Sequence, residues 1–228
     1  MHKKKIQALA VAGVLTVGVV GGTLAWFTSQ DSVKNTFNTG ASNDENGNGI
    51  KIVEEFTPPT DMLPGDEVNK DVQVKNTATY DQFVKVKLTP TFVEVGKDGS
   101  RNAIKQREII NELGQKQTYT LDTSKIILNF TGNLNADNSN GSWVKEGEYY
   151  YYMGKVKPSE LTSMLLDSVT LDKNAGNEYR GLVFDIDVEA KSTQASNDAY
   201  QEWAKGSGLL EKFAELQKQG VVEPRDTK

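Results

Sequence analysis

Metal-binding and nucleophilic side chains are scarce in this chain, which limits the chemistry that it can perform. The chain has no cysteine, and its one histidine is His2. Without these side chains it lacks the ligands of most zinc sites and both common activated-nucleophile pairs. The sequence also contains neither an HExxH nor a G-x-S-x-G motif. We therefore predict no catalytic residue, and we do not expect an enzyme.

Short oxygen-bearing side chains alternate in one Gly-rich stretch, with the spacing of a calcium-binding loop. Asp44, Asn46 and Asn48 precede Gly49, and Glu55 follows after five further residues. Such side chains around a glycine turn can surround Ca²⁺. Against calcium, asparagine at two positions lowers the ligand charge, no helix precedes the loop, and the residues after Gly49 have the pattern of a strand. A solvated Asn/Gly turn is our default interpretation. Calcium is the alternative, and no other cofactor is predicted.

Two further clusters have a functional and a structural interpretation. Asp185, Asp187 and Glu189 lie on one parity of a β-like run, where carboxylates could carry out acid–base work. We interpret them as a solvated, negatively charged outer face that discourages edge pairing. The four tyrosines 149–152 would place two rings on each face of a sheet. A carbohydrate-stacking platform is the alternative there, and we favour packing in the core and between subunits.

The N-terminal run organises the rest of the chain. Three lysines precede an uncharged apolar stretch, and Thr23 and Ala25 supply small residues at positions −3 and −1 of a cleavage site before Trp26. This is the order of a secretory signal peptide, which we assign to residues 1–25. A retained membrane anchor is the alternative, because the stretch is long enough to cross a bilayer.

The charge balance of the chain bears on its partners. The full chain carries 26 basic and 31 acidic side chains. Removing residues 1–25 takes away three lysines and leaves 23 against 31, a net charge of −8. An acidic exported protein lacks the basic surface that attracts nucleic acid, so no nucleic-acid partner is predicted.

The segment after the cleavage site, residues 26–40, has the pattern of an imperfect strand. Phe27, Val33 and Phe37 share one parity, with polar residues between them. One interpretation is a frayed terminus. The other is a donor strand that adds to the sheet of a neighbouring subunit, with these three residues as apolar anchors. Residues 41–49 would form a flexible polar linker behind it.

Three blocks of the sequence resemble the TasA/camelysin family. The first is Thr23-x-Ala25-x-Phe27-Thr28, followed by Asn35, Phe37 and Gly40. The second is the PGD…VQVKN block at 63–76. The third is the block at 143–162, in which Ser159 stands where glycine is commoner. Within the family, the chain is most similar to the BsaA-type, SipW-dependent biofilm matrix proteins.

This resemblance implies a secreted structural subunit located in the extracellular matrix or at the cell surface. Its main partner would be itself, as a homopolymer assembled by strand donation. A SipW-type signal peptidase would process it, and a sortase or a minor matrix protein are further partners that the resemblance suggests. Camelysin relatives have been classed as metallopeptidases, so such an enzyme remains an alternative. A secreted adhesin or glycan-binding module is another.

Many short alternating strands between Gly, Pro and Asn turns predict an antiparallel β-sandwich of jelly-roll type over residues 50–220. Residues 63–95 are expected to form a β-meander within one sheet. Residues 102–113 are expected to form a short helical insertion, because their apolar residues have helical spacing. A C-terminal amphipathic helix from Leu209 should pack on the sandwich. Residues 221–228 are expected to be a disordered tail, and strand order is not predicted.

Overall fold

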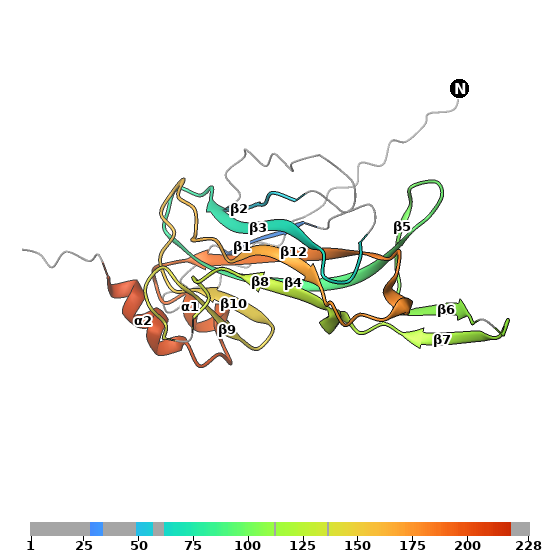
Figure 1. The fold of residues 1–228 in the computed structure, drawn as a ribbon. Coiled ribbons are helices and arrows are strands. Elements are labelled where there is room, and N and C mark those ends of the chain that lie inside the picture. The colour runs from blue at the N-terminus through green and yellow to red at the C-terminus, as the bar shows by residue number, and fades with distance from the viewer. Residues whose placement is uncertain (1–27, 34–48, 57–61, 112, 136, 220–228) are drawn as a thin grey trace, which may run out of the picture.

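Alternating apolar and polar residues build two antiparallel sheets that pack face to face (Figure 1). The computed structural model describes residues 28–33 (backbone only), 49–56, 62–111, 113–135 and 137–219. The predicted signal peptide and tail, and the linker up to Asn48, lie outside these ranges. No helix within the described ranges is long and apolar enough to cross a membrane.

The strands form two main sheets and one separate hairpin. The first sheet has the order β1 (Thr28–Val33), β12 (Val183–Gln194), β4 (Gln82–Val95), β10 (Tyr149–Tyr152), β9 (Trp143–Glu146), and β5 (Arg101–Ala103) also pairs with β4. The second has the order β2 (Ile50–Val53), β3 (Glu67–Asn76), β11 (Leu166–Leu171), β8 (Ile126–Phe130). The hairpin of β6 (Gln106–Ile110) and β7 (Lys116–Thr120) projects from one end of the body (Figure 1). The predicted antiparallel β-sandwich is thus confirmed.

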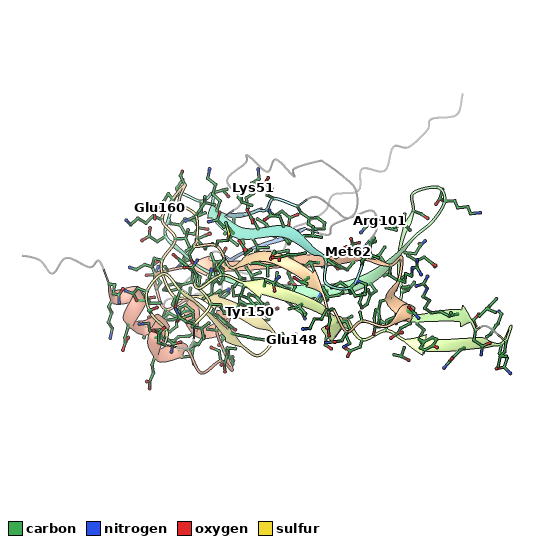
Figure 2. All side chains as sticks on the ribbon, viewed as in Figure 1. Lys51, Met62, Arg101, Glu148, Tyr150 and Glu160 are labelled. Carbon is green, nitrogen blue, oxygen red and sulfur yellow. The ribbon has the colours of Figure 1, made fainter. Side chains whose placement is uncertain are left out.

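The main core fills the space between the two sheets. Val72 and Val74 of β3 and Ile186 and Val188 of β12 are fully buried, and each comes from the apolar parity of its strand. Burying one such side chain stabilises the fold by roughly 1.5–3 kcal/mol. Tyr150 lies inside the body among these strands (Figure 2).

A second apolar cluster lies on the outer face of the first sheet, beneath the C-terminal helices. These are α1 (Tyr200–Trp203) and α2 (Leu210–Lys218). The Phe213 ring of α2 meets the Phe83 ring of β4 with a centroid separation of 4.9 Å, and Leu216 is 1% exposed. The amphipathic stripe that begins at Leu209 therefore packs on the sandwich, as predicted.

The helix expected over residues 102–113 is wrong. This stretch contains β5 and β6, and the chain turns back into β7 at Asn111–Gly114. The side-chain oxygen of Asn111 accepts hydrogen bonds from the backbone N–H groups of Leu113 and Gln115, at 3.0 and 2.9 Å. Gly114 adopts φ +76°, a conformation that glycine supplies readily. The turn chemistry thus outweighs the helical spacing of the isoleucines.

The meander expected over residues 63–95 is also wrong, because β3 and β4 belong to different sheets. Asn76, which is fully buried, makes the corner between them. Its side-chain N–H₂ group donates to the carbonyls of Tyr80 and Val156, at 2.8 and 2.7 Å, and its oxygen accepts from the Ala78 N–H at 2.8 Å. The Pro64-Gly65 turn at the start of the block does form, with Asp66 N–H bonded to the Leu63 carbonyl at 3.0 Å. Local turns were therefore predicted correctly, and sheet membership was not.

Candidate functional site

The N-terminal strand β1 lies at the edge of the first sheet, where it pairs with β12. Six antiparallel pairs run from Thr28 opposite Thr193 to Val33 opposite Val188. On its other side β12 pairs with β4 along its whole length. β12 is therefore held in the sheet by β4, whether or not β1 is paired with it. Without β1, its backbone donors and acceptors along residues 188–193 would face an open edge.

Along this edge, the side chains of β12 that face the core change from apolar to polar. Val188 and Ala190 are fully buried in the main core, and Ser192 follows them on the same parity with 1% exposure. β2 of the second sheet lies beside β1. A strand at the position of β1 therefore closes one side of the sandwich, and it needs backbone pairing and a small apolar contact surface to do so.

The structure places only part of the predicted donor segment. Val33 is the last residue of β1, opposite Val188 in the register. The other two predicted anchors, Phe27 and Phe37, lie outside the described residues, as do the cleavage-site residues Thr23, Ala25 and Trp26. Their roles stay predictions.

The acidic face of β12 differs from the solvated surface that we expected. Asp185 is only 6% exposed. The guanidinium of Arg101, from β5, donates to its carboxylate and to the Phe184 carbonyl. Glu189 is half-buried and pairs with Lys191 at 2.7 Å. Asp185 is covered because β5 folds back along β4 and brings the Arg101 guanidinium over it, whereas the partner of Glu189 comes from β12 itself. These two carboxylates serve as ion-pair partners in the fold.

The tyrosine strand places two rings on each face of the sheet, as its alternation predicts. Tyr150 and Tyr151 are each 5% exposed and point to opposite faces. Tyr150 stacks near Phe130 in the main core, with ring centroids 5.0 Å apart, and Tyr151 packs beneath α2 against Phe213 at 6.0 Å. Burial raises the pKa of both phenols. This geometry supports the prediction that the rings pack in the core.

The structure describes only one of the four predicted calcium ligands, so the calcium site stays a prediction. Asp44, Asn46 and Asn48 lie outside the described residues. The residues after Gly49 form β2, as their pattern indicated, and Glu55 is exposed, with its backbone carbonyl accepting from the Asp71 N–H at 3.1 Å. Within the described ranges, no group of three or more His, Cys, Asp or Glu side chains is arranged to hold a metal ion.

A lysine enclosed by aromatic rings was not predicted from the sequence. Lys85 of β4 is 9% exposed, and its ammonium lies 4.8 Å from the ring centroids of Tyr149 and Trp203 and 5.3 Å from that of Tyr151. It donates to the Trp203 carbonyl at 2.6 Å. Alternation placed Lys85 on the outward, charged face of its strand. Phe83 lies on the same face, and a large apolar side chain there could have indicated that another element covers this face.

A second lysine, Lys70 of β3, is fully buried. Its ammonium pairs with the Glu54 carboxylate at 2.5 Å and lies 4.6 Å from the Phe56 ring centroid. Burial lowers the pKa of Lys70, and the charge of Glu54 acts in the opposite direction. The alternation of β3 does place this lysine on the core parity, next to Val72.

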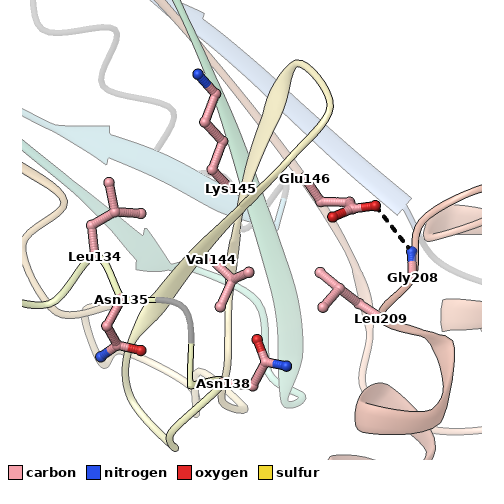
Figure 3. Close-up of a pocket in the computed structure, with 8 residues that line it drawn as sticks. All are labelled: Leu134, Asn135, Asn138, Val144, Lys145, Glu146, Gly208 and Leu209. Carbon is pink, nitrogen blue, oxygen red and sulfur yellow. Dashed lines mark hydrogen bonds between the residues drawn. The ribbon is translucent and has the colours of Figure 1, made fainter.

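A hollow beside β9 separates the sandwich from the loop before α2 (Figure 3). Leu134, Val144 and Leu209 contribute apolar side chains to it. Across it, the Glu146 carboxylate accepts a hydrogen bond from the Gly208 N–H at 3.3 Å (Figure 3). This contact ties the loop between the two helices to the β9–β10 turn.

Comparison with known protein families matches the chain to the family described as camelysin metallo-endopeptidase, over residues 1–198. The match covers most of the chain and ends before α1. No curated protein and no solved structure matches the chain.

Proposed function

Because the chain belongs to the camelysin family, we propose that it is a secreted structural subunit that polymerises into extracellular biofilm-matrix fibres. Each subunit donates its N-terminal strand to the sheet of the next one. The observation that carries this proposal is the position of β1, which pairs along β12 at the outer edge of the first sheet. An edge strand next to the chain terminus is the element that can leave with the least disruption of the body.

Strand donation replaces one set of contacts with an equivalent set. In a single chain, β1 satisfies the edge of its own β12. In a fibre, β1 of one subunit takes the same six positions on the β12 of the next, so the backbone hydrogen bonds are conserved. Such a head-to-tail contact does not close on itself and generates filaments. Residues 38–48, which follow the last predicted anchor, can extend over about 36–40 Å at most and connect the donated segment to its own body.

Export follows from the same proposal. A SipW-type signal peptidase cleaves after Ala25 and frees the segment that begins at Trp26. Phe27, Val33 and Phe37 anchor that segment in the acceptor subunit. The fibre is then located in the extracellular matrix or at the cell surface, with a sortase or a minor matrix protein as further partners.

The family description raises peptidase activity as a second function. A catalytic zinc site needs three protein ligands, commonly histidines, and His2 is the only histidine of the chain. The described residues hold no cluster of three metal-binding side chains. These residues do not fit a catalytic zinc, and we favour a structural role over a catalytic one.

The test compares two purified chains, one starting at Trp26 and one starting at Gly40, by negative-stain microscopy and size-exclusion chromatography. Filaments from the long chain and monomers from the short chain are the expected result. A third chain carries Asp31→Pro, because proline removes a ladder hydrogen bond from β1, and its matched control carries Asn43→Pro in the linker. The proposal fails if the short chain, or the Asp31→Pro chain, forms filaments as readily as the long one.

A further inference from the structure

Lys85 is held where three elements meet on the outer face of the first sheet. Tyr149 and Tyr151 come from the neighbouring strand β10, and Trp203 ends α1. The three rings surround the Lys85 ammonium at 4.8–5.3 Å. Within the described residues, no carboxylate pairs directly with it; the Trp203 carbonyl accepts its hydrogen bond at 2.6 Å.

A cavity of about 280 Å³ reaches this lysine from the surface. The β9–β10 turn forms one wall, with Glu146 and Glu148, and the loop after α1 forms the other, with Lys205 and Ser207. The hydrogen bond from Gly208 N–H to Glu146 holds the two walls together. A cavity of this size, lined by carboxylates, an ammonium and a hydroxyl, suits a small molecule that carries several hydroxyl groups.

The electrostatics make the neutral amine more accessible here than in an ordinary lysine. Burial, and then the charge of Lys191, lower the pKa of Lys85 to about 8, while Glu189 opposes the shift. Lys191 itself is held by Glu189 and by the Tyr149 hydroxyl, at 2.7 and 2.9 Å. Of the other charged groups around the cavity, Glu148 pairs with Lys87 at 2.8 Å and Lys205 pairs with Glu202 at 3.2 Å.

We propose that Lys85 is a nucleophilic amine that forms a Schiff base with a small hydroxylated aldehyde bound in this cavity. The ammonium first releases one proton. The nitrogen lone pair then attacks the aldehyde carbon, a C–N bond forms as the carbonyl π bond breaks, and a proton moves from the nitrogen to the oxygen, which becomes a hydroxyl. That hydroxyl takes up the released proton and leaves as water, as the C–O bond breaks and a C=N bond forms. Overall, the lysine ammonium and the aldehyde yield a protonated imine and one water molecule, and the charge of +1 is conserved.

The rings of Tyr149, Tyr151 and Trp203 form an aromatic box around Lys85. This aromatic box favours a protonated imine over an acylated lysine. Cation–π attraction requires a positive charge over the rings. A protonated imine keeps that charge, whereas an amide is neutral. The imine also keeps one N–H, which can continue to donate to the Trp203 carbonyl while the new carbon extends into the cavity.

The experiment exposes the full chain to glyceraldehyde and cyanoborohydride, and peptide mass spectrometry then measures labelling at each lysine. At pH 7.5 an amine with a pKa of about 8 has roughly 200 times more neutral form than an ordinary lysine. We expect Lys85 to be labelled at least about tenfold faster than Lys191, its neighbour on the same face. Labelling of Lys85 should also saturate with glyceraldehyde, and glycerol should slow it.

Each outcome decides one part of the proposal. Labelling of Lys85 no faster than that of Lys191 would overturn the nucleophilic role. A rate that rises linearly with glyceraldehyde and ignores glycerol would overturn the binding cavity. Lys85→Arg, with an unchanged circular dichroism spectrum, should remove the fast label and leave the other sites unaltered. The α-amino group, whose ordinary pKa is also near 8, serves as the reactive control.

Discussion

Lys70 and Lys85 occupy strands of the two facing sheets and are both withdrawn from solvent, but the protein compensates their charges in different ways. Lys70 is fully buried and pairs with a carboxylate, Glu54, at 2.5 Å. Lys85 has aromatic rings and a backbone carbonyl around it, and the pKa of its ammonium falls to about 8. Two buried lysines in one sandwich therefore differ in the chemistry open to them.

The difference separates a structural cation from a reactive one. A full opposite charge favours the ammonium form, because the pair interacts strongly in a medium of low dielectric constant. Burial is the largest effect on both lysines and lowers the pKa of each. Within the described residues no carboxylate pairs directly with Lys85, so its pKa falls to about 8 and the neutral amine becomes accessible near that pH. Lys70 thus holds two strands together, whereas Lys85 has a lone pair available at physiological pH.

The largest expected effect comes from removing the partner of Lys70. Glu54→Ala leaves a fully buried ammonium without a carboxylate, and breaking a buried pair in this way destabilises a protein by about 3–5 kcal/mol. Urea unfolding followed by tryptophan fluorescence measures the loss. We expect the lower end of this range, since the Glu54 side chain retains 17% exposure.

The neighbouring residue supplies the matched control for this variant. Glu55 is exposed, so Glu55→Ala should change the free energy of unfolding by less than about 0.5 kcal/mol. Equal losses in the two variants would mean that the Lys70–Glu54 pair contributes nothing specific. In that case, Lys70 and Lys85 would differ in how deeply they are buried, and the carboxylate partner of Lys70 would not distinguish them.

The sequence was sufficient for features that depend on local chemistry. Strict alternation located the core strands, including β12 and its buried Ile186 and Val188, and the Pro64-Gly65 pair located a turn. The apolar stripe containing Phe213 and Leu216 identified the face of α2 that packs on the sheet. Each of these signals lies within one element, so that no knowledge of distant contacts was needed.

Features that depend on which elements meet could not be predicted. Lys85 is covered by Trp203, 118 positions away, and Asp185 is paired with Arg101, 84 positions away. Alternation correctly put both on the outer face of the first sheet. It carried no information on α1 and β5, which supply Trp203 and Arg101 to that face. The same reason explains the incorrect meander, because the side chain of Asn76 decides which sheet the chain enters next.

The next effect in size is the pH dependence of stability due to Lys85. Its folded pKa of about 8 lies below the ordinary value of 10.5, so the unfolded chain binds more protons between these pH values. Stability should therefore rise with pH through this window, by at most about 3 kcal/mol. Lys85→Met should remove that rise. The two proteins contain the same tyrosines, so the wild-type minus variant difference from urea unfolding at pH 7 to 10.5 isolates Lys85. A difference that stays constant with pH would contradict the assignment.

The smallest expected effect is the change in the pKa of Lys85 when a neighbouring charge is removed. The direction of this change depends on which neighbour is replaced. Lys191 lowers the pKa of Lys85 and Glu189 raises it. Lys191→Met should therefore move the titration of Lys85 to higher pH, while Glu189→Gln should move it to lower pH. The ¹³Cε chemical shift of Lys85, followed by NMR in lysine-labelled protein, measures both changes directly. Opposite shifts would show that the two neighbours act through their charges. Shifts in the same direction would mean that these substitutions alter the packing of the aromatic box, since Lys191 also contacts the ring and the hydroxyl of Tyr149.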